Sequence, residues 1–74
     1  MTPTVGRTVH YTQPDDEEPV NGQKTHAAII TQVFGDDCIN LTFFAPGRSP
    51  QFGFSVVRDA TTGAASWSWP ERVA

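Results

Sequence analysis

The sequence predicts an all-β fold, a small five-stranded SH3-like barrel, with an OB-like barrel as the alternative. Two observations support this prediction: five short segments rich in β-forming residues, and the absence of a sustained 3.6-residue apolar period. Six glycines and six prolines separate these segments within 74 residues. A barrel suits so short a chain because closing a sheet removes its exposed edges. The long first loop and a closing terminal strand favour the SH3-like form.

The first two predicted strands flank a long polar loop. Residues 4–12 alternate along the chain, and one face carries Val5, Arg7, Val9 and Tyr11. Residues 13–24 contain two prolines, four consecutive acids and an Asn-Gly step, and predict a solvated, acidic loop. Residues 25–34 are the most apolar segment. Their Ile-Ile pair predicts a strand that is buried on both faces near Ala28 to Ile30.

Three shorter strands complete the predicted barrel. Residues 38–44 alternate, so that Ile39, Leu41 and Phe43 face inward. Residues 52–58 place Phe52, Phe54 and Val56 on one side, and Gly53 among them indicates a bulge or a close backbone approach. Residues 66–69 form the last strand, which ends at Pro70 because proline has no N–H to donate to a ladder.

The chain is predicted to be a single domain, residues 1–74, and it lacks the usual means of stabilising a domain of this size. Cys38 is the only cysteine, so no intrachain disulfide can form. His10 and His26 are the only other soft ligands, too few for a structural zinc site with four protein ligands. A single core seldom stabilises a chain below roughly 70–80 residues by more than about 3–5 kcal/mol. We therefore expect self-association into a homo-oligomer.

Charge and composition narrow the classes of partner. The formal charge is −3, and five basic residues stand among eight acidic ones. Because non-specific nucleic-acid binding depends on many Lys and Arg contacts to phosphates, a polymeric nucleic-acid partner is not expected. The longest apolar run, residues 27–30, is too short to span a bilayer, and no secretory signal is predicted. The lone thiol indicates a reducing, intracellular setting.

Three blocks of the sequence carry a resemblance to other proteins. They are "PTVGRTVHY" at the start, "AAIITQV" in the middle and "WSWPERV" at the end. In this order they resemble a group of short phage and prophage proteins that open with Pro-x-Val-Gly-Arg-x-Val-His-Tyr and close with Trp-x-Trp-Pro-x-Arg-Val. The resemblance spans essentially the whole chain, and the loop between Gln13 and Lys24 varies in that group. It implies a bacteriophage accessory protein that acts in the host bacterial cytoplasm.

That group's pattern assigns no catalytic residue, and it often has His where this chain has Ser68. The sequence itself contains no catalytic constellation either. Cys38 lacks any signature of pairing with His10 or His26. The acids of residues 15–18 are adjacent, whereas calcium loops alternate their oxygen ligands around a glycine. We predict a protein that is not an enzyme and has no cofactor or metal.

Aromatic and cationic side chains are the remaining candidates for binding. Trp67 and Trp69 share one face of the last strand, which should neighbour the first strand in an SH3-like barrel. If the two indoles face inward, they close the barrel with Val9 and Phe54. If they face outward, they form a platform for a planar anionic ligand such as a nucleotide. The candidate ligand-binding residues are Trp67, Trp69, Arg72, Arg7, Tyr11, His10 and Arg48.

Three functions remain open on the sequence. The first is a non-enzymatic phage module that sequesters a nucleotide-type signal of host immunity, at a site between subunits. The second is a virion component of the head, neck or tail. The third is a protein-binding inhibitor of a host defence enzyme. In the third case, the acids of residues 15–18 would mimic nucleic acid or contact a basic host surface.

Overall fold

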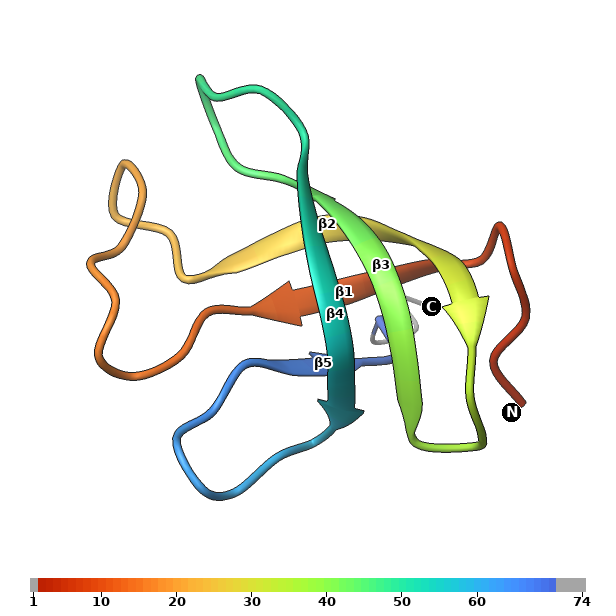
Figure 1. The fold of residues 1–74 in the computed structure, drawn as a ribbon. Coiled ribbons are helices and arrows are strands. Elements are labelled where there is room, and N and C mark those ends of the chain that lie inside the picture. The colour runs from red at the N-terminus through yellow and green to blue at the C-terminus, as the bar shows by residue number, and fades with distance from the viewer. Residues whose placement is uncertain (1, 71–74) are drawn as a thin grey trace.

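Five strands form a closed β-barrel without helices in the computed structural model, which describes residues 2–70. The predicted all-β barrel is therefore confirmed (Figure 1). The strands are β1 (Thr8–Thr12), β2 (Thr25–Val33), β3 (Cys38–Phe44), β4 (Gln51–Arg58) and β5 (Ser66–Ser68).

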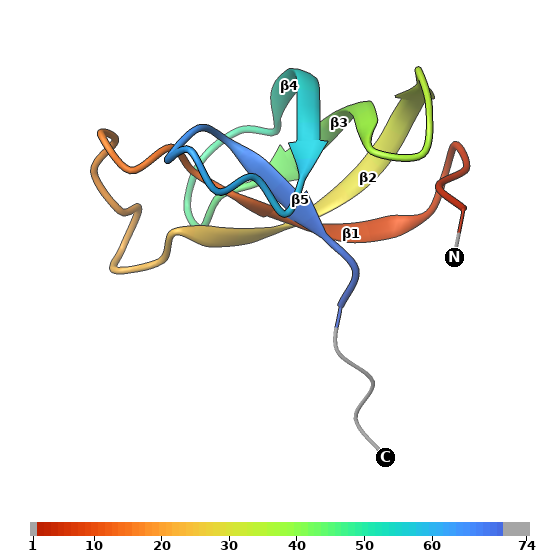
Figure 2. The ribbon, with the colours of Figure 1, turned by 90° about the horizontal axis from the view of Figure 1, so that it is seen from below.

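The strands follow one another around the barrel in chain order. β1 through β4 form an antiparallel meander, and β5 then closes the barrel between its two ends. It pairs antiparallel with β1, where His10 lies opposite Ser68, and parallel with β4, where Val57 lies opposite Ser66. An OB-fold is a Greek-key barrel, so the sequential order fits the SH3-like alternative. Figure 2 shows β5 crossing the opening between β1 and β4.

β1 starts four residues later than predicted, because the chain turns before it. Gly6 adopts a φ of 93°, in the left-handed region that favours glycine. Its N–H donates to the carbonyl of Ile30 at 2.8 Å, and the N–H of Arg7 donates to the carbonyl of Thr4 at 3.2 Å. Val5 is consequently 67% exposed and does not share the buried face of Val9 and Tyr11.

β2 alternates between buried and exposed residues along most of its length, so the prediction of burial on both faces was wrong. His26, Ala28 and Ile30 face the core, whereas Ala27 and Ile29 lie on the outer surface. A barrel this small has one interior, and among residues 2–70 no second layer of strands lies over the outer face of β2.

β4 also departs from the predicted pattern. Phe52 and Phe54 are 71% and 73% exposed, so Phe54 does not help to fill the barrel. Gly53 faces inward instead, where an added Cβ would lie 3.0 Å from Leu41 Cδ1 and 3.2 Å from Val56 Cγ2. The register then shifts, with Ser55 at a φ of 50°, which returns Val56 to the interior. Of the two alternatives predicted for Gly53, a bulge occurs in this strand, two residues further on, and the close contacts at Gly53 are with side chains.

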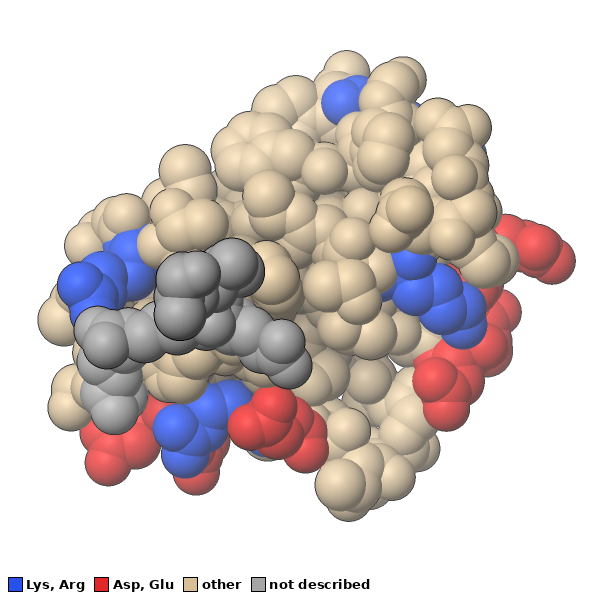
Figure 3. All heavy atoms as spheres, turned by 180° about the vertical axis from the view of Figure 1, so that it is seen from behind, with Lys and Arg blue, Asp and Glu red and all other residues tan. Residues whose placement is uncertain are grey.

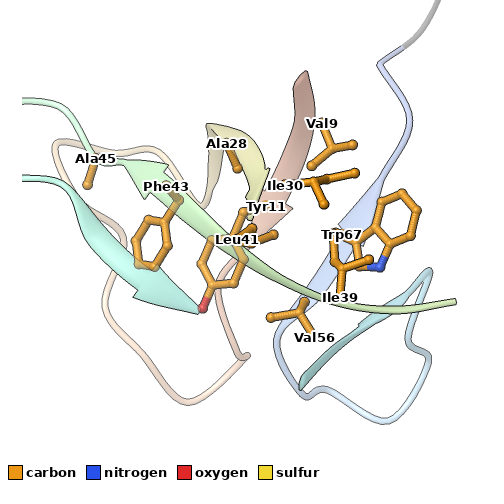
Figure 4. Packing of buried hydrophobic residues seen from close by; sticks show 10 residues of the cluster. All are labelled: Val9, Tyr11, Ala28, Ile30, Ile39, Leu41, Phe43, Ala45, Val56 and Trp67. Atoms are coloured by element: carbon orange, nitrogen blue, oxygen red, sulfur yellow. The ribbon is translucent and has the colours of Figure 1, made fainter. Parts of the chain in front are cut away.

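The core runs through the barrel from one open end to the other. Its ten buried apolar residues are Val9, Tyr11, Ala28, Ile30, Ile39, Leu41, Phe43, Ala45, Val56 and Trp67. Figure 4 shows Trp67 beside Ile39 at one end, and Phe43 and Ala45 at the other. The alternation predicted for β3 is confirmed, since its three inward residues all belong to this core.

Candidate binding site

Trp67 is part of the core and cannot contact a ligand. Its side chain is 0% exposed, and its indole Nε1 donates to the carbonyl oxygen of Asp37 at 2.9 Å. Trp69 lies on the same face, as predicted, with its ring edge-on to that of Trp67 at a centroid distance of 5.3 Å and an interplanar angle of 82°. Trp67 thus follows the inward alternative, whereas Trp69 is partly exposed and packs against the edge of the core.

Trp69 and Arg7 lie together at this end of the barrel. The guanidinium carbon of Arg7 lies 5.7 Å from the Trp69 ring centroid, in the geometry of a cation–π contact. The predicted convergence of the first and last strands is therefore confirmed for this pair. However, a cation of the same chain lies over one face of the ring on which a planar ligand was expected to stack. Arg72, another predicted contact, lies outside the described residues.

Tyr11 and His10 lie on opposite faces of β1. Tyr11 is buried, and its ring stacks on Phe43 at a centroid distance of 4.1 Å and an interplanar angle of 16°. Burial, together with the negative charge of Glu17, raises the pKa of Tyr11 above its ordinary value of 10.0. His10 lies opposite Ser68 and is partly exposed. These two residues therefore do not join Trp69 and Arg7 in one ligand site.

His26 connects the barrel to the acidic loop. It is 4% exposed and lies across from Tyr11, so its side chain and that of His10 are on opposite faces of the sheet. Its Nε2 lies 2.8 Å from Gln13 Oε1, and Gln13 Nε2 donates to the carbonyl of Glu18 at 2.9 Å. No cluster of three or more His, Cys, Asp or Glu residues that could hold a metal occurs in residues 2–70.

A groove lies between the acidic loop and the β3–β4 turn, with a volume of about 260 Å³. We call it the loop groove. Its apolar lining consists of Pro19, Val20, Phe43 and Ala45. Its polar lining consists of Gln13, Glu17, Glu18, Arg48 and Gln51. Arg48, predicted as a ligand contact, thus lies here, and neither tryptophan lines the groove.

The charges at the loop groove are mostly negative and exposed. Within residues 2–70, Arg58 and Asp37 form an ion pair at 2.6 Å, and neither Glu17 nor Glu18 has such a partner. The ammonium group of Lys24, which is in the same loop, donates to the backbone carbonyl of Asp15 at 3.2 Å and not to a carboxylate. Figure 3 shows acidic and basic side chains side by side along the lower and right margins of the rear face, below a broad area that is mostly uncharged.

Comparison with known proteins gives no relative. No protein-family model matches the chain, and no curated protein or solved structure is significantly similar to it. The phage resemblance therefore stays a prediction from the sequence. No helix among residues 2–70 is long and apolar enough to cross a membrane.

Sequence reasoning missed the loop groove, although one signal was present. Gln13 continues the inward alternation of Val9 and Tyr11, so its position predicts a buried side chain inside a stretch of otherwise solvated residues. A buried amide requires hydrogen-bond partners, and His26 of the neighbouring strand supplies one. This connection holds the start of the acidic loop against the barrel.

Proposed function

We propose that the protein is a non-enzymatic binding module whose loop groove engages a basic segment of a partner protein. This is the third of the functions that the sequence leaves open. The observation that supports it most is that two exposed carboxylates, Glu17 and Glu18, line the same groove as the apolar residues Phe43 and Val20.

The size of the loop groove favours a peptide over a small molecule. Pockets for drug-sized ligands occupy about 300–1,000 Å³ and bury most of the ligand. At about 260 Å³ the loop groove is smaller, and it fits one or two side chains of a longer segment. An apolar side chain would pack on Phe43, and a Lys or Arg beside it would reach the carboxylates of Glu17 and Glu18.

The nucleotide-binding alternative has less support from the geometry. It requires a free aromatic face beside a cation, whereas Trp67 is buried and one face of Trp69 is already in contact with Arg7. A second hollow of about 360 Å³ includes the carboxylates of Asp15 and Asp59 but no basic residue. Its charge would repel a phosphate. The virion alternative stays a prediction from the fold and the phage resemblance.

The phage resemblance indicates where the proposed partner comes from, namely the host cell. A phage-encoded module that contacts a basic surface of a host defence enzyme would block the site where that enzyme holds nucleic acid. Within this proposal the buried network of His26 and Gln13 has a positioning role, because it fixes the backbone of Glu18 beside the groove.

Selection from a random peptide library displayed on beads tests the proposed function. The expected binders carry Lys or Arg next to an apolar residue, and the variant with residues 15–18 all changed to Ser loses them. Asp36→Asn removes an exposed acid at the β2–β3 turn and is the matched control, which should retain binding. Binders without basic residues, or binders unaffected by the loop substitutions, would overturn the proposal. A thermal shift with cyclic nucleotides would support the first alternative instead.

A further inference from the structure

We propose that the outer face of β2, β3 and β4 around Thr42 is a homodimer interface that packs against the same face of a second copy of this chain. The face consists of Ile29, Thr42, Phe44, Phe52 and Phe54, and we call it the aromatic face. This surface is separate from the loop groove, so the proposal does not depend on the proposed function.

Strand pairing makes the aromatic face continuous. Thr42 is at its centre, opposite Ile29 on β2 and opposite Phe52 on β4. Phe44 follows two residues later on the same side of β3, because side chains two apart in a strand share a face. The rings of Phe52 and Phe54 contact each other at a centroid distance of 6.4 Å. Exposed aromatic residues thus gather on one part of the barrel surface.

The charge of this face favours a second copy over a charged partner. None of its five residues is ionisable, and residues 49–57 carry no charge, although the chain has a net charge of −3. A two-fold axis brings identical patches together, so any net charge on the patch would face the same charge on the second copy. A neutral apolar face meets this condition, whereas an acidic or basic partner would gain no ion pair there.

The exposed area of the aromatic face is also comparable to the area that a dimer interface buries. Aromatic side chains bury about 150–250 Å² each, so Phe52 and Phe54 from two copies contribute about 600 Å² at their observed exposure. Specific interfaces begin at roughly 1,200 Å² in total, and Ile29, Phe44 and the surrounding polar rim of both copies supply the remainder. Trp67, by contrast, cannot take part in a subunit seam, because it is fully buried.

Sedimentation velocity over a range of protein concentrations tests this interface. The wild-type chain is expected to be a dimer, and Phe54→Glu is expected to weaken dimerisation at least about tenfold because a two-fold axis places the new charges near each other. Val5→Glu introduces the same charge at another exposed apolar residue and should leave the dimer intact. High salt should not dissociate the dimer, since its seam contains no ion pair.

Two further measurements distinguish a loss of dimerisation from a loss of folding and detect the interface directly. Near-ultraviolet circular dichroism of both variants checks that the environment of Trp67 is native, and Phe52→Ser replaces Phe54→Glu if the latter does not fold. Mixed isotope labelling should give intermolecular NOEs between Phe52 or Phe54 ring protons and the second copy. A wild-type monomer at millimolar concentration would overturn the proposal. So would a dimer that survives Phe54→Glu. Neither result would bear on binding at the loop groove.

Discussion

His26 Nε2 lies 2.8 Å from Gln13 Oε1, and this buried contact joins the second strand of the barrel to the start of the acidic loop. Because the amide oxygen of Gln13 can only accept, the histidine donates from Nε2. The amide nitrogen of Gln13 then donates to the carbonyl of Glu18 at 2.9 Å. These two side chains thereby connect the barrel to the backbone of Glu18 beside the loop groove.

Gln13→Ala is expected to lower the free energy of unfolding by about 1–3 kcal/mol, because it leaves a buried donor of His26 without a partner. Urea unfolding followed by tryptophan fluorescence measures the loss. Gln23→Ala, at an exposed glutamine in the same loop, is the control and should change stability by less than about 0.5 kcal/mol. Equal effects of the two substitutions would show that the contact with His26 contributes nothing.

Trp67→Ala should remove the folded state, whereas Trp69→Ala should leave a folded protein. Truncating a fully buried large aromatic residue costs about 3–5 kcal/mol, which is as much as a core of this size provides. Trp69 is only partly buried and loses its edge contact and its contact with Arg7. Thermal unfolding by circular dichroism distinguishes the two. A cooperative transition for Trp67→Ala at the wild-type temperature would contradict the assigned core.

Gly53→Ala is expected to destabilise the barrel by about 1–3 kcal/mol, since the new methyl group would push against Leu41 and Val56. Gly35→Ala is the matched control. An added Cβ at Gly35 meets no atom within 4 Å, so this variant should unfold near the wild-type denaturant concentration. Equal stability of the two variants would mean that the bulge in β4 relaxes to make room.

Alkaline pH should destabilise the protein through Tyr11. Its folded-state pKa is raised above the unfolded value near 10.0 by burial and by Glu17, so the folded state holds the phenol proton more tightly. The associated stability is complete below pH 10 and is lost as the pH rises through the folded pKa. Tyr11 is the only tyrosine, so absorbance of the phenolate reports this group alone.

Tyr11→Phe should remove this part of the pH dependence while keeping the ring on Phe43. Glu17→Gln should bring the Tyr11 pKa closer to its ordinary value. A titration of the folded wild-type protein at or below pH 10, with a stability curve identical to that of Tyr11→Phe, would contradict the assignment.

Local pattern predicted most of the barrel. The bounds of β3 follow from strict alternation between Cys38 and Phe44, and the end of β5 before Pro70 follows from the missing N–H of proline. The expectations that failed did so for different local reasons, and the turn at Gly6 kept Val5 out of β1. The bulge at Ser55 put Val56 on the face opposite to Phe54, and the Ile-Ile pair of β2 placed one isoleucine on each face.

The binding surface was harder to predict from the sequence than the barrel. The acidic loop was recognised from its composition, but its position beside Phe43 and Arg48 depends on contacts between residues far apart in the chain. The aromatic and basic residues near the two ends of the sequence attracted the first hypothesis. Their packing against one another, Arg7 on Trp69 and Trp69 on Trp67, is a tertiary property that spacing alone does not reveal.

The most direct test of the proposed function is an NMR titration of the ¹⁵N-labelled protein with a selected peptide that carries a basic residue beside an apolar one. The proposal predicts that the largest amide shifts occur at Gln13, Val20, Arg48 and Gln51, and that Glu17→Gln together with Glu18→Gln abolishes them. Shifts confined to Arg7 and Trp69, or to Phe52 and Phe54, would contradict binding at the loop groove.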